Sequence, residues 1–430
     1  MRYGLRLNFH WALADSLLAS YEDAHAMTMS LASLFGQDWP WARQLVPRLL
    51  TKFLEKPNRQ DLLDFLATDE SIHQAWSEQL EELCAATWQF GPQLDRASVA
   101  AETWGLPRLA TEIDLANWFE VSAPELAWFA DSHCLNSKSA SERLRHYRAW
   151  LVPKGDGRHR LIEAPKPRLR QMQRKVLNEI LARIPAHPAA HGFVRGRGVL
   201  SFAEQHQQAA LLLRFDLRDF FPSIRRARVE AAFRSMGYSS SVSKCLANLC
   251  TSVCPAALAK QAGEIYQQRR LPQGAPTSPG LANYCAHRLD ARLAGLAAAT
   301  GGFYSRYADD LAFSGDQNFA RQATWVRREV NAIVQDEGFL LNQQKTKTLG
   351  RGQRQLVAGI VLNAGTHVPR EDRKRLEAIL TSCAKHGWAA QNRMNHPDFL
   401  AHLHGRIRWV ESTCPAHGAK LRRIFEQIPA

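Results

Sequence analysis

The sequence predicts an α+β protein with a helical N-terminal extension, and two patterns indicate this. Apolar side chains recur at helical spacing in the first part of the chain, whereas short apolar strands alternate with helical stretches from about residue 147 onward. Strands that alternate with helices are typical of a mixed domain rather than an all-helical one. Because domains usually contain roughly 100–200 residues, the 430 residues suggest two or three domains.

The N-terminal segment, residues 1–140, is predicted to be a helical accessory domain. Apolar residues have three-and-four spacing at 62–66, and two short helices are expected at 114–119 and 124–129. Four prolines are expected to separate helices in this segment: Pro40, Pro47, Pro57 and Pro92. No repeat and no chemical constellation occurs here, so a scaffold role is favoured.

Charge divides the chain at a small, polar stretch near residues 137–141. The whole chain has 55 Lys and Arg against 41 Asp and Glu, a formal net charge of +14. Residues 1–140 contain 10 basic and 19 acidic residues, a balance of −9, which leaves 45 and 22, or +23, for residues 141–430. Such an excess is typical of a surface that binds nucleic-acid phosphates, although a cationic surface that only maintains solubility gives the same count.

The cysteines and the hydropathy pattern give expectations about the cellular setting. The spacing of Cys245, Cys250 and Cys254 fits no common zinc pattern, so buried apolar thiols are favoured over a metal site. His10 and Asp15 interrupt the apolar N-terminal stretch, and no run of about 18 apolar residues occurs. We therefore expect a cytoplasmic protein without a membrane span.

Apolar runs between turn residues place the strands of the mixed domain. Strands are expected at residues 147–153, 159–165, 211–215, 304–308, 311–314 and 356–362. The first two flank the turn Lys154-Gly-Asp-Gly and read as a hairpin, and the fourth and fifth form a second hairpin.

Three carboxylates fall at the ends of these strands. Asp309 and Asp310 are adjacent at the turn of the second hairpin, and Asp216 directly follows the strand at 211–215. Neighbouring carboxylates raise each other's pKa, so placing them together is costly unless a cation offsets their repulsion. For the pair alone a solvated turn is the alternative, because Asp favours turns. The third carboxylate favours a cage of hard oxygens for two Mg²⁺ ions, as in enzymes of phosphoryl transfer.

Several motifs, in order along the chain, resemble those of reverse transcriptases. The palm motifs of that family are matched by Asp216 with Asp219-Phe-Phe, by Leu271-Pro-Gln-Gly-Ala-Pro-Thr-Ser-Pro and by Tyr307-Ala-Asp-Asp. Residues 154–165 resemble the fingers hairpin, and Gly338-Phe-Leu-Leu-Asn-Gln-Gln-Lys-Thr resembles the motif whose lysine approaches the incoming nucleotide.

Within that family the chain is most similar to the bacterial retron enzymes. The stretches that carry this likeness are Pro188-Ala-Ala-His-Gly-Phe, Tyr307-Ala-Asp-Asp and Val357-Ala-Gly-Ile-Val-Leu-Asn. The resemblance covers about residues 145–430 and implies a right-hand fingers–palm–thumb polymerase. It assigns fingers and palm to residues 141–365 and a helical thumb to residues 366–430.

The resemblance also implies roles for individual residues. Asp216, Asp309 and Asp310 would be catalytic and hold two Mg²⁺ ions, with Mn²⁺ as a substitute. Phe221 would stand where a ribose 2′-OH would lie, although a core phenylalanine beside Phe220 is the alternative. The other nucleotide-binding residues would be Lys154 and Arg160 at the triphosphate, Gln273 at the sugar, Lys345 at the leaving pyrophosphate, and Asp219 and Phe220 beside Phe221. Solvated hairpin charges are the alternative for Lys154 and Arg160.

The predicted thumb combines basic and aromatic side chains, which can follow a phosphate backbone and stack on exposed bases. An amphipathic helix packed on the palm is the alternative, and the two are compatible. The candidate RNA- or duplex-binding residues are Arg373, Lys374, Arg406, Arg408, Trp409, Lys420, Arg422 and Arg423.

These patterns favour an RNA-directed DNA polymerase. A retron enzyme would use a structured noncoding RNA as template and primer, take dNTPs, and make a short RNA-linked DNA, with an effector protein as a further partner in antiphage defence. One alternative is another bacterial defence reverse transcriptase, protein-primed or template-independent. A second is a non-catalytic, maturase-like RNA-binding protein, which the intact Asp216, Asp309 and Asp310 disfavour.

Overall fold

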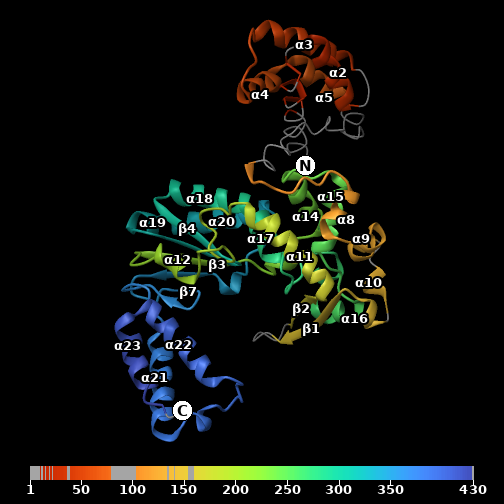
Figure 1. The fold of residues 1–430 in the computed structure, drawn as a ribbon. Coiled ribbons are helices and arrows are strands. Elements are labelled where there is room, and N and C mark those ends of the chain that lie inside the picture. Colours follow the sequence, from red (N-terminus) through yellow and green to blue (C-terminus); the bar gives the residue numbers. More distant parts are fainter. Residues whose placement is uncertain are drawn as a thin grey trace. The chain divides into compact units, whose positions relative to one another are not determined.

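The computed structural model describes residues 10, 13, 14, 16–18, 20, 21, 23–35, 39–78, 103–132, 135–139, 141–153 and 159–428. The chain forms two compact units, Met1–Ala100 and Ala101–Ala430 (Figure 1). Lys154, at the predicted turn of the first hairpin, lies outside the described residues.

Helices make up the described part of the first unit. They are α2 (Ala24–Phe35), α3 (Pro40–Lys52), α4 (Arg59–Thr68) and α5 (Glu70–Glu78). Pro47 lies inside α3 rather than between two helices, so that prediction is wrong. A proline inside a helix costs about 3 kcal/mol. The buried side chains of Leu45, Val46 and Leu49 on the same helix offset that cost.

Residues 103–139 pack with the second unit, so the boundary predicted at residue 140 lies instead at Ala100. Their helices are α8 (Glu112–Phe119), α9 (Ala123–Ala130) and α10 (Leu135–Lys138). Helices α8 and α9 share one apolar core with the later helices, and Trp118 Nε1 donates a hydrogen bond to Glu179 at 3.0 Å. These contacts, rather than the change of composition near residue 140, set the boundary.

The first predicted hairpin is confirmed and is called the fingers hairpin below. Strands β1 (Tyr147–Pro153) and β2 (His159–Pro165) pair antiparallel, with Pro153 opposite His159. Helix α11 (Pro167–Glu179) and the short helix η2 (Leu181–Arg183) follow. The hairpin packs on a small apolar cluster that contains Leu161, Cys254 and Tyr266.

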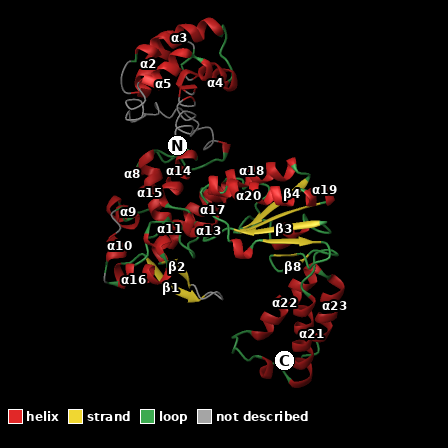
Figure 2. Ribbon diagram, turned by 180° about the vertical axis from the view of Figure 1, so that it is seen from behind, coloured by secondary structure: helices red, strands yellow, loops and turns green. Residues whose placement is uncertain are grey.

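A four-stranded antiparallel sheet, the palm sheet, contains the second predicted hairpin (Figure 2). The strand order is β4-β5-β3-β6. The strands are β3 (Leu211–Asp216), β4 (Gly302–Tyr307), β5 (Asp310–Gly315) and β6 (Lys347–Gly350). The other elements of the palm region are α12 (Val199–Glu204), α13 (Phe220–Ser223), α14 (Arg226–Ser235), α15 (Ser240–Cys250), α16 (Ala256–Ala262), η3 (Glu264–Gln267), α17 (Ser278–Cys285), α18 (His287–Ala299), α19 (Gln317–Arg321), α20 (Ala323–Asp336) and η4 (Gln343–Lys345).

The two faces of the palm sheet are covered by different elements. Leu213 and Phe313 on one face pack in the main core with α18 and α20. Leu212 and Ala312 on the other face pack with α12 and with the strands β7 (Leu356–Val357) and β8 (Ile360–Val361). Figures 1 and 2 show this division, with α18 and α20 on one side of the sheet and β7 and β8 on the other.

The single strand predicted over 356–362 is wrong, because the chain reverses in its middle. Ala358 has a φ of 42° and Gly359 a φ of 84°, and these two residues form the turn between β7 and β8. Burial of Val357 and Ile360 on the palm sheet favours this turn over a continuous strand.

Three helices, α21 (Arg370–His386), α22 (Phe399–Thr413) and α23 (Pro415–Phe425), form the thumb bundle. They have a core of their own, which includes Leu376, Leu403 and Leu421. The helix predicted from residue 370 is therefore confirmed.

Two further observations concern the cysteines and the membrane. Cys245, Cys250 and Cys254 are buried, and burial raises the pKa of each thiol to about 12, as expected for apolar packing. Over the residues that the structure describes, every helix is too short or too polar to cross a membrane.

Candidate active site

Two neighbouring strands bring three carboxylates to one end of the palm sheet. A two-residue turn, Ala308–Asp309, joins β4 to β5, and Ala308 adopts a φ of 55°. Asp216 of β3 pairs in register with Asp310 of β5, and the Leu217 N–H donates to the carbonyl oxygen of Asp309 at 2.8 Å. The positions of Asp216, Asp309 and Asp310 are thus coupled by backbone hydrogen bonds.

Strand alternation decides which way the side chains of these strands project. Successive residues of a strand point to opposite faces. Asp216 therefore shares a face with Leu212, and Asp310 shares a face with Ala312. That face is the one packed against α12 and β7–β8. The two carboxylates project away from α18 and α20.

The negative charge of the carboxylates is only partly balanced by nearby cationic side chains. Burial, followed by the nearby charge of Asp310, raises the pKa of Asp309 to about 6. Burial is also the main cause that raises the pKa of Asp310, whereas Arg214 opposes it. Both shifts show that the ionised forms are poorly compensated by the protein alone.

Two cationic side chains contact the carboxylates. Lys345 Nζ lies 2.8 Å from Asp216 Oδ2, and Arg214 Nη2 lies 3.4 Å from Asp310 Oδ1. The hydrogen bond to Asp216 is the main cause that raises the pKa of Lys345. Arg214 also donates to the carbonyl oxygen of Leu356 at 3.0 Å, which ties it to β7. The structure thus places Lys345, predicted from its motif, in direct contact with the aspartates.

The donor set fits a divalent cation. Among the described side chains, no group of three His, Cys, Asp or Glu residues is close enough, as it stands, to hold an ion. Instead, the side chain of Asp216 is paired with Lys345, and the side chain of Asp310 is paired with Arg214. Carboxylate oxygens are the ligands that Mg²⁺ prefers, and the raised pKa of Asp309 indicates uncompensated charge. A bound cation would therefore share these carboxylates with the two side chains or take over their place.

A buried ion pair that the sequence did not reveal supports the Ala308–Asp309 turn, called the catalytic turn below after the role expected of its aspartate. Arg306 and Asp290 are both 0% exposed, and their side chains meet at 2.6 Å. Arg306 also donates to the carbonyl oxygen of Ala308 at 3.1 Å and to Asn283 Oδ1 at 3.0 Å. The position of Arg306, directly before Tyr307-Ala-Asp-Asp, was the available signal. Its partner Asp290 lies on α18, and that contact cannot be placed from the motif.

Phe221 follows Asp216 by five positions in the chain. It belongs to α13, which begins after Asp219, a residue with a φ of 47°. Its half-buried ring lies 5.5 Å from the ring of Phe220, which is 3% exposed. Phe220 is therefore a core residue, and Phe221 is the member of the pair that reaches the surface. Asp219 Oδ2 lies 3.6 Å from Arg218 Nε.

The loop that carries Gln273 is held against the fingers hairpin. The Glu163 N–H donates to the carbonyl oxygen of Gln273 at 2.8 Å. Gly274 has a φ of 125°, and a Cβ there would lie 2.9 Å from the Glu163 carbonyl oxygen, so glycine is required. The side-chain oxygen Oε1 of Gln273 is buried without a hydrogen-bond partner. That free acceptor suits a hydroxyl donor of a ligand.

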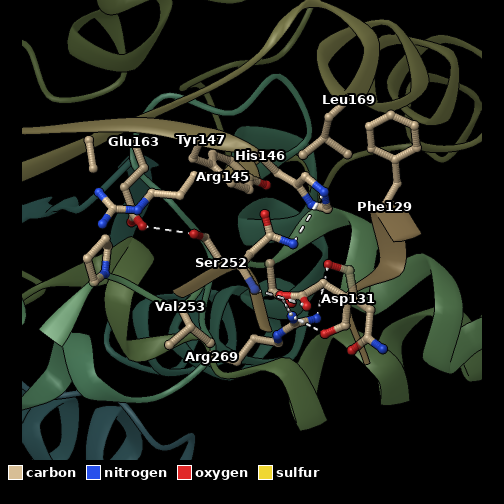
Figure 3. A pocket seen from close by; sticks show the side chains of 15 residues that line it. Phe129, Asp131, Arg145, His146, Tyr147, Glu163, Leu169, Ser252, Val253 and Arg269 are labelled. Carbon is tan, nitrogen blue, oxygen red and sulfur yellow. Dashed lines mark hydrogen bonds and ion pairs between the residues drawn. The ribbon is translucent and has the colours of Figure 1, made fainter. Parts of the chain in front are cut away.

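A buried pair beneath the fingers hairpin fixes the same loop. Arg270 Nη2 lies 2.9 Å from Glu163 Oε2, and both side chains are almost fully buried. Beside them is a cavity of about 30 Å³, enough for about one water molecule. Figure 3 shows that its lining joins residues distant in sequence, with Asp131 beside Arg269 and Ser252 beside Glu163. This cavity is a junction between segments, and Asp216, Asp309 and Asp310 do not line it.

Not all predicted residues are brought to the aspartates. Arg160 is exposed on β2, opposite Val152. On the thumb bundle, Lys420 pairs with Glu377 at 2.6 Å and Arg422 pairs with Glu411. The Nε atom of Arg373 is buried without a hydrogen-bond partner. The exposed candidates on the thumb bundle are Lys374, Arg408, Trp409, Lys420 and Arg423, and Arg406 is half-buried.

The fold and the site together define a class of enzyme. An antiparallel sheet with carboxylates on neighbouring strands, a fingers hairpin and a helical thumb bundle are the parts of a right-hand nucleotide polymerase. Residues 152–362 match the family Reverse transcriptase (RNA-dependent DNA polymerase), whose members use divalent metal ions.

Known relatives narrow the class further. The chain is 38% identical over 333 residues to the retron Mx65 reverse transcriptase of Myxococcus xanthus, covering 76% of this chain and 74% of the relative. It is 33% identical over 235 residues to the retron Ec86 reverse transcriptase of Escherichia coli, covering 54% of this chain and 68% of the relative. The chain belongs to the retron reverse transcriptases and is an RNA-directed DNA polymerase.

A solved structure of a foamy viral protease-reverse transcriptase in complex with double-stranded DNA overlaps only loosely. The TM-score is 0.32 at 17% identity, with 66% of this chain and 43% of that chain covered. The family assignment therefore depends on the sequence matches.

Proposed function

We propose that this enzyme uses one structured noncoding RNA as both template and primer and makes a short DNA that stays linked to it. The identity to several retron reverse transcriptases is the observation that carries this proposal. In such a reaction a 2′-OH of the RNA attacks the α-phosphorus of the first dNTP. The +23 charge balance of residues 141–430 suits a chain that holds a long RNA.

In the proposed site, Asp216, Asp309 and Asp310 hold two Mg²⁺ ions, or Mn²⁺ in their place. Such ions activate the attacking oxygen and stabilise the leaving one. Lys345, already in contact with Asp216, offsets charge on the departing pyrophosphate. Arg160 and Lys154 bind the triphosphate, which charge-assisted hydrogen bonds favour. Gln273 accepts a hydrogen bond from the nucleotide sugar through its free Oε1.

Purification of the enzyme, followed by sequencing of the nucleic acid that is bound to it, tests the proposal. We expect a branched molecule of defined length, in which DNA is joined to an internal 2′-OH of one RNA. Untemplated homopolymer, or DNA joined to a protein side chain, would instead support a template-independent or protein-primed defence enzyme. RNA without any DNA would support a maturase-like binding protein.

We further propose that the enzyme acts in antiphage defence together with an effector protein. Deletion of the gene, followed by challenge of the cells with phage, tests this role.

The proposed sugar gate gives a prediction for Phe221→Ala. Removal of the half-buried ring should open the space that a ribose 2′-OH would need. Discrimination between dNTPs and rNTPs is measured as the ratio of their kcat/KM values. We expect this ratio to fall by about tenfold or more, because one misfitting group in a binding pocket changes kcat/KM by at least that factor. Phe319→Leu serves as the control, because Phe319 is buried at the end of the palm sheet opposite the aspartates. It should lower stability with the ratio retained. An unchanged ratio in Phe221→Ala would remove the gate assignment.

On the thumb bundle, we propose that α21 contributes to the grip on the duplex. One face of this helix is open along much of its length. This face carries Lys374 near one end, Lys385 and His386 near the other, and the small side chains Ala378 and Ser382 between them. Glu377 lies on the same face, and its charge is paired with Lys420. Small side chains between cations allow a helix to approach a phosphate backbone closely.

The ion pairs on the thumb bundle predict unequal effects of charge removal. Arg408→Ala should weaken binding to a primer–template and lower the slope of log K against log salt by about 1, because an exposed cation contacts a phosphate. Arg422→Ala should change the slope less, because Arg422 already pairs with Glu411. Salt titrations of binding compare the two variants. Equal slopes would show that the ion pair does not withdraw Arg422 from nucleic acid.

A further inference from the structure

The loop before α12 lies directly against the catalytic turn. The His191 N–H donates to the carbonyl oxygen of Arg306 at 2.7 Å, and Asn283 Nδ2 donates to the carbonyl oxygen of Gly192 at 2.9 Å. A Cβ at Gly192 would lie 2.5 Å from the backbone nitrogen of Ala308, so the two backbones touch. The loop is therefore fixed to the same buried residues that support the turn.

The next residue, Phe193, has an unusual backbone conformation. Its φ is 62°, in the left-handed region that bulky side chains rarely adopt. The side chain is 52% exposed, so burial of the ring in the core does not explain the conformation. Strained residues of this kind persist where the surroundings fix them, and they are common at functional sites.

The strained conformation directs the Phe193 ring toward the predicted sugar gate. The ring centroid lies 5.9 Å from that of Phe221, at an interplanar angle of 56°. It lies 6.5 Å from that of Tyr307, the residue that opens the catalytic turn. Phe221 also meets Phe220, which packs on Phe339 at 5.7 Å. Phe221 therefore has one buried aromatic neighbour and one exposed aromatic neighbour.

We propose that Phe193 is a positioning residue for sugar selection. Phe220 supports the gate ring from the core, and Phe193 limits its rotation on the solvent side. A phenylalanine that is only half-buried has freedom to change rotamer, and a ring that rotates away no longer blocks a 2′-OH. Phe193 thus acts through Phe221 and need not touch the nucleotide. The inference rests on the proposed gate function of Phe221.

A double-mutant cycle in the full-length enzyme tests this inference. Single-nucleotide incorporation on a defined primer–template gives kcat and KM for a dNTP and for the matching rNTP. Phe193→Ala should lower the dNTP-to-rNTP ratio of kcat/KM by about threefold to tenfold, the range that an aromatic pair contributes. Phe221→Ala should lower it further, and the double variant should equal Phe221→Ala, because Phe193 has no effect without the gate ring.

Conservative variants separate the role of the ring from that of the backbone. Phe193→Tyr retains the ring and should retain the ratio. Phe193→Gly relieves the strained φ but removes the ring, and it should resemble Phe193→Ala. Thermal unfolding confirms that each variant folds, and Phe193→Leu replaces Phe193→Ala if that variant does not.

The outcomes distinguish failure of this inference from failure of the gate. If Phe221→Ala changes the ratio and Phe193→Ala does not, the gate stands and the inference is overturned. Additive effects of the two changes would overturn it as well, because Phe193 would then act independently. An equal rise in KM for dNTP and rNTP in Phe193→Ala, as expected if the ring stacks on a base, also contradicts it. If neither variant changes the ratio, the gate assignment itself fails.

Discussion

Asp309→Asn should abolish DNA synthesis, with kcat for primer extension in Mg²⁺ reduced by about a thousandfold or more, because loss of a metal ligand removes several kcal/mol of transition-state stabilisation. Asp309 sits in the turn between β4 and β5. The substitution does not alter its backbone, so the hydrogen bond from the Leu217 N–H to its carbonyl oxygen is retained. The amide is neutral, so the burial of a charge and the repulsion from Asp310, which raise the pKa of Asp309, are both relieved. The variant should therefore be at least as stable as the parent while it is inactive.

The control for this change is an exposed carboxylate on the same domain. Asp336 pairs with Arg292 at 3.0 Å, and its side chain is 70% exposed. Asp336→Asn should leave the extension rate unchanged within about twofold, since exposed ion pairs contribute little. The branched RNA–DNA product should be absent from cells that carry Asp309→Asn and present in those with Asp336→Asn. Normal product from Asp309→Asn would contradict the assignment of the three aspartates.

Asp290→Asn should destabilise the second unit by about 3–5 kcal/mol, the usual cost when one partner of a buried ion pair is removed. Arg306 is 0% exposed and makes its closest contact with Asp290. Tyr304 also donates its hydroxyl hydrogen to Asp290 Oδ1 at 2.8 Å. The variant leaves a buried guanidinium without a counter-charge. Urea unfolding of the full chain, followed by circular dichroism, measures the change.

An exposed pair and a paired replacement serve as controls for that result. Glu329→Gln breaks the contact of Glu329 with Arg328, whose side chain is 74% exposed. It should leave the urea concentration at the midpoint of unfolding unchanged. Replacement of both partners, Asp290→Leu with Arg306→Met, should cost less than Asp290→Asn alone, because no charge then remains buried. A midpoint for Asp290→Asn equal to that of the parent would show that the pair does not support the turn.

The positions of the three carboxylates at the strand ends were predictable because their signals are local. A strand that ends in Asp216 and a hairpin that carries Asp309 and Asp310 at its turn can be read from short stretches of sequence. The motif order of a known family then relates the two stretches to each other. The fingers hairpin and the helix at residue 370 were predictable for the same reason.

Other features depended on contacts between distant segments. The domain boundary moved from residue 140 to Ala100 because α8 and α9 share the core of the second unit. The strand predicted over 356–362 became a hairpin because both of its halves pack on the palm sheet. Pro47 lies within a helix because its neighbours are buried. In each case tertiary packing outweighed a local preference.

The sequence by itself determined the class of chemistry, because carboxylates at strand ends and a family's ordered motifs are written in consecutive residues. Only the tertiary structure decided which residues support that chemistry. Lys345 meets Asp216, and Arg306 meets Asp290, although the first pair is 129 residues apart in the chain. Phe193 meets Phe221 through a backbone conformation that only the surrounding contacts impose. Long-range packing and buried charge are not encoded in any single stretch, so the sequence pattern alone could not reveal them.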